Sequence, residues 1–402
     1  MYITVKRIKE EDKIRSKLHD RVDALFSNNP VDSEPFVWEE PKKLYRTYTM
    51  NKPFSWSALT EEERHRIHRL TGYAHNMNMT LGAYRDVDYN KMYYEFKIPK
   101  RSGGFRTIEA PDEALKEIMY TQLKFLKSLK ILNHDAAWAY TQGRDVVGAM
   151  KEHNNNHSRW YLKLDLENFF GSITEDYIVS QLLNLYPFPA LHSVSTNAFN
   201  VYTRAIETYL RNLARLACRN GALPQGTPLS PILSNWVMVE HDYNITKFLS
   251  RFKKEHNLPR LVYTRYADDI IISCKDGFDY LELIKGLEEV LKDSPFKFNK
   301  KKTRYASSAG RNWNLGIMCN KDNQLTVGHR RKSQIKQAIN NFMHNHDVWN
   351  LEDCNSLLGQ LSWLHKVEPG YAKGLMEYYR KKWDKNPRTL LIDTIKKLNS
   401  EF

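Results

Sequence analysis

The sequence predicts an α+β fold, in which antiparallel strand pairs come before a helical C-terminal segment. Residues 92–110 and 261–273 each contain two strand-like runs separated by a turn, which predicts β-hairpins. From Arg330 onward the spacing of apolar residues is purely helical, with a break at Pro369-Gly370. Strands followed by a run of helices are typical of α+β proteins.

The first part of the chain is expected to alternate between helices and short strands. A helix over 60–73 opens with a threonine cap followed by three glutamates. Strands over 92–98 and 106–110 flank a basic turn that contains two adjacent glycines. Helical periodicity follows over 112–129, and the short apolar run 160–166 predicts a strand with an acid near its end.

The second part of the chain continues this alternation. An amphipathic helix is expected over 198–219, and a further helix begins at Ser230, with Ser230 as its cap and a proline in its first turn. After the 261–273 hairpin we expect a helix over 280–291 and a small strand pair within 314–325.

Composition excludes several classes of protein. The chain has 402 residues, 41% of them hydrophobic, which is enough for a folded core. No apolar run approaches the about 18 residues of a membrane span, and residues 1–12 lack the apolar stretch of a secretory signal. We therefore expect a cytoplasmic protein without a membrane partner. No CxxC pair occurs, so neither a zinc ribbon nor a disulfide scaffold is expected from the four cysteines, Cys218, Cys274, Cys319 and Cys354.

The net charge of +14 favours a polyanionic partner. Basic clusters at 297–304, 329–336 and 380–388 lie in the last third of the chain, and aromatic residues make up 12% of it. Basic side chains interleaved with aromatic ones suit neutralisation of a nucleic-acid backbone and stacking on bases. The alternative, which charge alone leaves open, is a solvated basic surface on an ordinary enzyme.

Three aspartates are the strongest candidates for catalysis. Asp268 and Asp269 lie at the expected turn of the 261–273 hairpin, and Asp165 lies at the end of the 160–166 strand. The alternative is a solvated turn, but surface hairpins usually carry Asn-Gly or Asp-Gly, and glycine is absent here. Adjacent carboxylates between β-branched runs repel each other unless a divalent cation binds, and oxygen ligands select Mg²⁺. We expect these three aspartates to hold two Mg²⁺ ions, with Mn²⁺ as an alternative.

The residues around the aspartates resemble the motifs of reverse transcriptases. YADD resembles the YxDD box, LDLENFF the first carboxylate motif, and LPQGTPLSPILSN the motif between them. IPKRSGGFRTIEAP is similar to the fingers hairpin, and KFNKKKT and the expected strand NLGI follow the YADD box. The motifs occur in the family's order, at residues 98–111, 164–170, 223–235, 266–269, 297–303 and 314–317.

The resemblance implies a right-hand polymerase fold and an RNA-directed DNA polymerase. It implies fingers and palm with an antiparallel sheet over 61–325, a helical thumb over 326–402, and an N-terminal extension over 1–60. At the start of the thumb, the basic side chains of Arg330, Arg331 and Lys332 would hold the template–primer backbone.

The resemblance also implies residues that bind the incoming nucleotide. Lys100 and Arg106, on opposite arms of the expected hairpin, would hold the triphosphate, and Gln225 would contact the sugar or base. Phe170 would be the steric gate beneath the sugar 2′-position, although one of Phe169 and Phe170 is expected to be a core residue. Lys302 would neutralise or protonate pyrophosphate; among three consecutive lysines, Lys300 and Lys301 remain alternatives.

Within the family, the chain resembles the compact bacterial retron and defence-associated enzymes. The segment 139–153 is similar to a retron stretch ending in NAxxH, but Gly148 stands where Asn is expected and His153 falls one residue late. NLG at 314–316 stands at the position of the retron VTG. These departures favour a sister class of defence-associated enzyme that copies its own structured non-coding RNA. The implied partners are this RNA as template and candidate primer, dNTPs, the cDNA product, and a toxin or effector protein as a further candidate.

Two other functions remain open from the sequence. One is a template-independent or protein-primed nucleotidyltransferase, although Gln225 and the basic thumb favour templated synthesis. The other is a catalytically silent RNA-binding scaffold. The complete set of Asp165, Asp268 and Asp269 counts against a scaffold, because loss of metal ligands is typical of inactive polymerases.

Overall fold

The computed structural model describes residues 60–82, 84, 86–99, 103–129, 131–185, 188, 201–310 and 312–400. The expected extension 1–60 lies outside the described residues apart from Thr60, and so does Lys100. The chain divides into two compact units. Unit 1 is drawn from residues 1–134, 167–245 and 290–296, and unit 2 from 135–166, 246–289 and 297–402.

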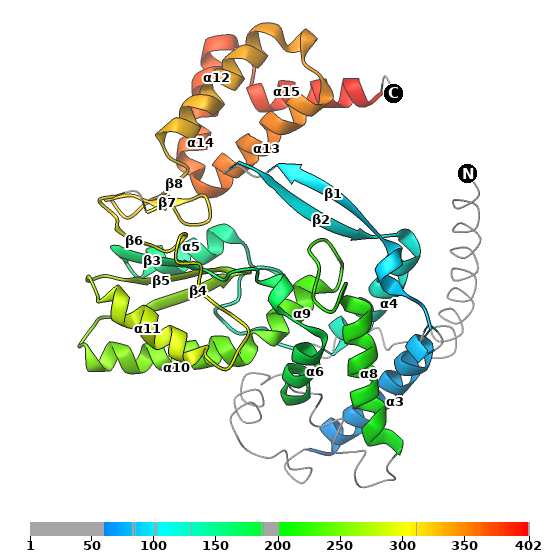
Figure 1. The fold of residues 1–402 in the computed structure, drawn as a ribbon. Coiled ribbons are helices and arrows are strands. Elements are labelled where there is room, and N and C mark those ends of the chain that lie inside the picture. The colour runs from blue at the N-terminus through cyan, green and yellow to red at the C-terminus, as the bar shows by residue number, and fades with distance from the viewer. Residues whose placement is uncertain are drawn as a thin grey trace. The chain divides into compact units, whose positions relative to one another are not determined.

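Unit 2 contains an antiparallel four-stranded sheet in the order β4-β5-β3-β6 (Figure 1). Its strands are β3 (Trp160–Asp165), β4 (Val262–Tyr266), β5 (Asp269–Cys274) and β6 (Arg304–Ser307). The isoleucines of β5 are buried, as expected for a β-branched run in the middle of a sheet. The predicted 261–273 hairpin is confirmed as β4 and β5, but Asp269 is the first residue of β5 rather than a turn residue.

Unit 1 contains a two-stranded hairpin and most of the helices that come before the YADD box. The hairpin pairs β1 (Tyr93–Pro99) with β2 (Phe105–Pro111), as predicted. At its tip Gly103 and Gly104 have φ of 88° and 76°, a conformation that glycine adopts without strain. The unit's helices are α3 (Glu61–Gly82), η2 (Tyr89–Met92), α4 (Glu113–Ser128), η3 (Phe170–Ser172), α6 (Glu175–Asn184), α8 (Val201–Ala217) and α9 (Ser230–Val237).

Side chains just before several helices accept hydrogen bonds from backbone N–H groups that the first turn leaves unpaired. Asp112 Oδ1 accepts from Leu115 N at 2.9 Å before α4, and Thr174 does the same before α6. Ser230 was predicted to cap α9 but is its first residue, and the cap position is Leu229. The buried Ser230 hydroxyl donates instead to Pro224 O at 2.8 Å, so it stabilises the loop before the helix.

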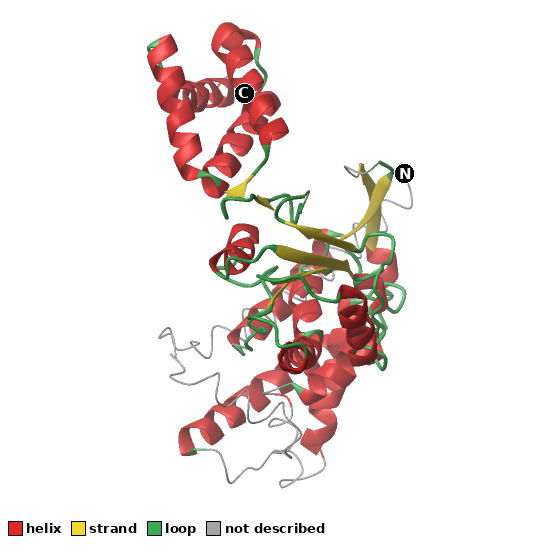
Figure 2. Cartoon of the chain, turned by 90° about the vertical axis from the view of Figure 1, so that its left-hand side faces the viewer, coloured by secondary structure: helices red, strands yellow, loops and turns green. Residues whose placement is uncertain are grey.

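The remaining helices belong to unit 2, except that α10 (Val239–Glu255) and the last residue of α11 contribute to unit 1 as well. Figure 2 shows that the region after the last strand consists of helices only, as predicted. The predicted break is confirmed, because one helix ends at Val367 and the next begins at Pro369. The elements are α5 (Val146–Asn155), α11 (Tyr280–Val290), β7 (Met318–Cys319), β8 (Leu325–Thr326), α12 (His329–Asn345), η4 (His346–Val348), α13 (Leu351–Val367), α14 (Pro369–Trp383) and α15 (Pro387–Ser400).

One hydrophobic core connects the sheet of unit 2 to its C-terminal helices. It includes Tyr161 and Ile271 from the sheet together with Ile339, Phe342 and Leu364 from the helices. Burial of these side chains is the main term that holds the C-terminal helices on the sheet. None of the helices in the described part of the chain combines the length and apolarity that a bilayer crossing needs.

The NLGI segment forms a tight turn rather than the predicted strand. Asn314 and Ile317 exchange backbone hydrogen bonds of 2.8 and 2.9 Å. The two residues between them, Leu315 and Gly316, have φ of 52° and 80°. Two consecutive positive φ angles are typical of a type I′ turn, which explains the glycine.

Candidate active site

The pairing of β3 with β5 brings the predicted carboxylates together. Asp165 and Asp269 occupy facing positions at the ends of these antiparallel strands. Asp268 lies in the turn just before β5, and its carbonyl oxygen accepts a hydrogen bond from Leu166 N at 2.9 Å. Asp165 therefore lies beside the distant Asp268-Asp269 pair at one end of the sheet, because facing residues in a strand pair are only about 5 Å apart.

The turn that presents Asp268 has a conformation unusual for its sequence. Ala267 has a φ of 56°, which is unfavourable for a residue with a side chain and costs on the order of 1 kcal/mol or more. The guanidinium of Arg265, itself 1% exposed, donates to Ala267 O at 3.2 Å. This buried arginine, which sequence reasoning missed, stabilises the strained turn at the position where Asp268 leaves the sheet.

The electrostatic environment of Asp268 disfavours its negative charge. Burial raises the pKa of the Asp268 carboxyl above its usual range, and the charges of Asp269 and Asp165 raise it further. Three carboxylates so close together repel one another unless cations lie between them. The donor set, which consists of oxygens only, fits Mg²⁺ or a similar hard divalent ion.

Lys302 is the lysine that reaches this cluster. Its Nζ donates to both carboxylate oxygens of Asp165, at 2.9 and 3.1 Å, and Asp165 is only 6% exposed. This hydrogen bond raises the pKa of the Lys302 ammonium. The backbone around Asn299 explains why Lys302, of the three lysines, makes this contact. Asn299 N donates to the backbone oxygen of Asp165 at 2.8 Å, and Lys302 N donates to Asn299 O at 3.0 Å. Lys300 and Lys301 are exposed to solvent.

Lys163 is a second cation at the cluster, and it was not among the residues predicted from the sequence. Its Nζ lies 2.8 Å from Asp269 Oδ1, and both side chains are largely buried. Lys163 lies two residues before Asp165, so both point to the same face of β3. A lysine at this spacing in an otherwise apolar strand was the signal that could have identified it.

The described residues contain no group of three or more His, Cys, Asp or Glu side chains arranged to hold a metal ion. The expected ligands Asp165 and Asp269 are instead paired with Lys302 and Lys163. The two ammonium groups supply the positive charge that the carboxylates require. The residues fit a divalent cation by charge and donor type, and binding would displace or rearrange the lysines.

Of the remaining residues predicted to bind the nucleotide, the structure describes Arg106, Phe170 and Gln225, all of them in unit 1. Gln225 is half-buried. Its backbone carbonyl oxygen accepts a hydrogen bond from Glu109 N at 3.0 Å, which connects the LPQG loop to β2. Gly226 has a φ of 117°, and an added Cβ would lie 2.8 Å from Ile108 Cγ2. The glycine is therefore required by the close approach to the hairpin. Arg106, on the same strand β2, is exposed and accessible to an anion.

Phe169 and Phe170 differ in burial, which agrees with the expectation that one of the two is a core residue. Phe169 is 3% exposed and packs against Phe296 with ring centroids 5.6 Å apart. Phe170 is only half-buried and contacts the Phe169 ring edge-on at 5.2 Å. Phe169 is thus the core residue, and Phe170 is the ring with a surface available to a ligand.

The three basic residues at the start of the C-terminal helices are not equivalent. Arg330 is exposed, and Arg331 is partly exposed. Lys332 forms an ion pair with Glu368 and lies 4.3 Å from the centre of the Tyr371 ring. Glu368 also accepts hydrogen bonds from Thr326 Oγ1 and Val327 N, both at 2.8 Å. The ammonium of Lys332 is therefore already paired within the protein, where it connects α12 to Glu368 and to Tyr371 of α14.

The two positions that depart from the expected retron pattern have clear packing roles. A Cβ on Gly148 would lie 2.4 Å from the Trp138 ring, so this ring occupies the space of a side chain. His153 is fully buried, with Nδ1 2.6 Å from Ser273 Oγ and Nε2 2.8 Å from Thr264 Oγ1. Its contacts join α5 to both strands of the YADD hairpin.

Comparisons with known proteins agree with this geometry. A family profile described as "Reverse transcriptase (RNA-dependent DNA polymerase)" matches residues 98–344. The retron Ec83 reverse transcriptase of Escherichia coli is 30% identical over 303 residues, which cover 71% of this chain and 86% of that protein. The retron Ec73 enzyme of the same organism is 27% identical over 302 residues, covering 73% and 89%.

Among solved structures, an apo telomerase from Candida tropicalis is 14% identical, with a TM-score of 0.42 over 76% of this chain and 62% of that chain. The family match includes β2, the carboxylates and Lys302, and it extends into α12. The antiparallel sheets and C-terminal helices agree with the right-hand polymerase fold expected from the sequence motifs. The departures at Gly148 and His153 thus occur within a chain similar to retron enzymes over most of its length. The chain belongs to the reverse transcriptase (RNA-dependent DNA polymerase) family, and it is an RNA-directed DNA polymerase of the retron type.

Proposed function

We propose that the protein copies a structured non-coding RNA into cDNA by two-metal-ion nucleotidyl transfer at Asp165, Asp268 and Asp269. The observation that carries the proposal is the facing position of Asp165 and Asp269 on β3 and β5, with Asp268 in the adjoining turn. A lysine pairs with each of the two facing carboxylates, which supports a site built to hold positive charge.

The three aspartates would hold the Mg²⁺ ions, with Mn²⁺ as the alternative. When bound, such ions activate the attacking hydroxyl and stabilise the leaving pyrophosphate. Asp165 holds Lys302 in its protonated form, because their hydrogen bond raises the pKa of the ammonium. When a cation takes the place of Lys302 at Asp165, Lys302 Nζ would be released to donate a proton to the departing pyrophosphate oxygen, which is general acid catalysis.

Four further residues are proposed to bind the nucleotide. Arg106, together with Lys100, would neutralise the triphosphate, and Gln225 would contact the sugar or base. Phe170 would exclude a ribose 2′-hydroxyl, because its ring has an accessible face whereas Phe169 is in the core. Selection of dNTPs over rNTPs would follow from this steric contact.

The RNA template, the cell compartment and the biological role are also proposals. We propose that the RNA serves as template and primer, and that Arg330 and Arg331 contact its backbone from a thumb over 326–402. The names of the similar retron enzymes support a retron-like role. In this proposal the enzyme acts in the cytoplasm in anti-phage defence, together with a toxin or effector protein.

Primer extension on an RNA template tests the catalytic proposal. Asp268→Asn and Asp165→Asn should each lower dNTP incorporation by about 10³-fold or more, since the ions they hold supply several kcal/mol of transition-state stabilisation. Asp322→Asn is the matched control, because Asp322 is an exposed aspartate in the β7–β8 turn. In all three variants the RNA affinity and the melting temperature should stay near those of the unsubstituted protein.

Retained incorporation in Asp268→Asn, with a lower melting temperature, would show that these carboxylates serve folding rather than catalysis. Incorporation that does not need a template would favour the template-independent alternative. Sequencing of the nucleic acid that co-purifies with the protein would identify the template.

A further inference from the structure

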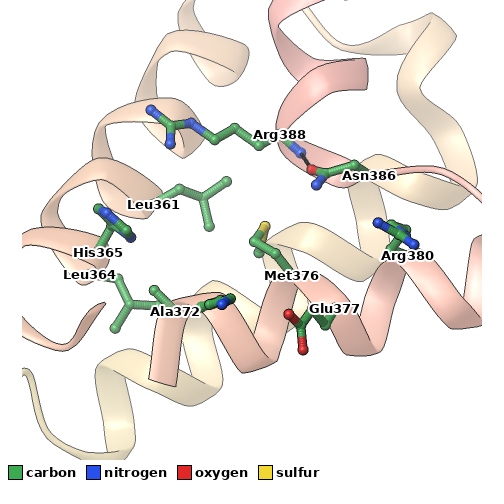
Figure 3. Close-up of a pocket in the computed structure, with 10 residues that line it drawn as sticks. Leu361, Leu364, His365, Ala372, Met376, Glu377, Arg380, Asn386 and Arg388 are labelled. Carbon is green, nitrogen blue, oxygen red and sulfur yellow. Dashed lines mark hydrogen bonds between the residues drawn. The ribbon is translucent and has the colours of Figure 1, made fainter. Parts of the chain in front are cut away.

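The C-terminal helices of unit 2 form an open pocket apart from the carboxylate cluster. It has a volume of about 320 Å³, within the range of small-molecule sites. It lies between α13, α14 and the start of α15 (Figure 3). Asp384, with a φ of 53°, ends α14 and turns the chain so that Asn386 and Arg388 return to the pocket.

The floor of the pocket is apolar. Leu361 and Leu364 come from α13, and Ala372 and Met376 come from α14. Met376 is only half-buried and points into the cavity in Figure 3. An apolar surface of this kind suits a flat, uncharged ring, which gains free energy when it leaves water.

The rim of the pocket is basic. Lys373, Arg380 and Arg388 are basic residues, and all three are exposed, as is His365. Within the part of the chain that the structure describes, none of these cations forms an ion pair with a carboxylate. Glu377 is the one acidic residue among those lining the pocket.

We propose that this pocket binds one unpaired nucleotide of a single-stranded nucleic acid. The apolar floor would accept the base, and the cations on the rim would neutralise the phosphates on either side of it. Arg388 reaches across the cavity above Leu361 in Figure 3, where its planar guanidinium could stack on a base or pair with a phosphate. A base pair within a duplex has no free face to insert, so the pocket would discriminate single strands from duplexes.

The proposal concerns a site that shares no residue with the carboxylate cluster. Asp268→Asn should therefore remove polymerisation and leave strand binding at the pocket unchanged. Failure of one proposal would leave the other intact, because the two are measured by different assays.

The first test removes charge at the rim. Arg380→Gln/Arg388→Gln should weaken binding of a single-stranded 12-nucleotide RNA by about tenfold or more and lower the slope of log affinity against log salt by about 1.4. Lys381→Gln/Lys385→Gln is the matched control, since both lysines are exposed, near the pocket and outside its lining. Equal losses in the two double variants would overturn the proposal.

The second test fills the pocket at constant charge. Met376→Trp should weaken binding of the single strand severalfold and leave binding of the corresponding duplex unchanged. A 2-aminopurine in the strand should lose fluorescence on binding to the wild-type protein, and this quenching should decrease in the variant. If Met376→Trp lowers the melting temperature, the result with Arg380→Gln/Arg388→Gln decides whether the pocket binds the strand. Both arginines are exposed and outside the core, so their substitution leaves the fold intact.

Competitors distinguish the unpaired nucleotide from other ligands. Adenosine monophosphate should displace the strand only at concentrations far above those of the oligonucleotide. Displacement by equal concentrations would assign the pocket to a free nucleotide and overturn the proposal. Displacement by polyglutamate, lost in Arg380→Gln/Arg388→Gln, would indicate an acidic protein partner and would also overturn it.

Discussion

Lys302 donates from one ammonium group to both carboxylate oxygens of Asp165, and 137 positions separate the two residues in the sequence. The contact depends on the turn after Phe298, which is held by a hydrogen bond from Asn299 N to Asp165 O. The same turn leaves Lys300 and Lys301 in solvent. One lysine of three is therefore placed where it can move from Asp165 to a phosphate when a metal ion takes the carboxylate.

Substitution of Lys302 should affect catalysis, whereas substitution of its neighbour should not. We expect Lys302→Ala to lower dNTP incorporation by about 10²–10⁴-fold, the usual contribution of a general acid. Lys301→Ala should retain the wild-type rate, because its side chain is exposed and contacts no carboxylate of the cluster. Single-turnover primer extension at saturating dNTP measures both. A normal rate in Lys302→Ala would exclude the proposed proton donor.

The two adjacent phenylalanines should give different phenotypes. Phe170→Ala should raise rNTP incorporation relative to dNTP, because it removes the ring proposed to lie beneath the sugar. Phe169→Ala should mainly lower the free energy of unfolding, by about 3–5 kcal/mol, because that ring is 3% exposed and packed on Phe296. Primer extension with each nucleotide set and urea unfolding separate the effects. Exchanged phenotypes would show that the motif is displaced by one residue.

Neutralising the basic residues at the start of α12 should divide them into two classes. Arg330→Gln and Arg331→Gln should each reduce the salt dependence of RNA binding by roughly 0.7–0.9 in the log–log slope. Lys332→Gln should leave this slope unchanged and cost about 1–3 kcal/mol of stability, because Glu368 would lose its ammonium partner. Binding titrations at several salt concentrations, with melting curves, distinguish the classes. A reduced slope in Lys332→Gln would mean that this lysine leaves Glu368 to contact RNA.

Stability should fall on mild acidification because of His153. Burial lowers the pKa of His153 to about 3, whereas an unfolded histidine titrates near 6.5. The unfolded state therefore binds a proton first, so stability is full above about pH 6.5 and is lost at up to about 1.4 kcal/mol per pH unit below it.

Urea unfolding at pH 7, 6 and 5 measures this dependence of stability on pH. His153→Gln should flatten it in this range, whereas His329→Gln, at an exposed position, should not. The same pH dependence in wild type and His153→Gln would assign the acid sensitivity to other groups.

The local structure of this protein was largely determined by its sequence. The hairpin at 93–111, the YADD hairpin and the C-terminal helices occur where periodicity and turn residues predicted them. The α+β class and the order of the motifs follow from the same information. These features depend on interactions between residues close together in the chain, so the residue pattern of a short sequence window predicts them.

The tertiary structure decided which of several equivalent side chains makes each contact. It placed Lys302 rather than Lys301 against Asp165, put Lys163 beside Asp269, and committed Lys332 to Glu368. It also made NLGI a turn and required glycine at Gly226 for close approach to β2. The lysine contacts depend on strand register and on packing between segments more than 30 residues apart. The turn at NLGI and the glycine at 226 depend on backbone angles set by that packing. A pattern of residue types does not contain this information, because neighbouring lysines have the same chemistry until the fold places one of them near a carboxylate.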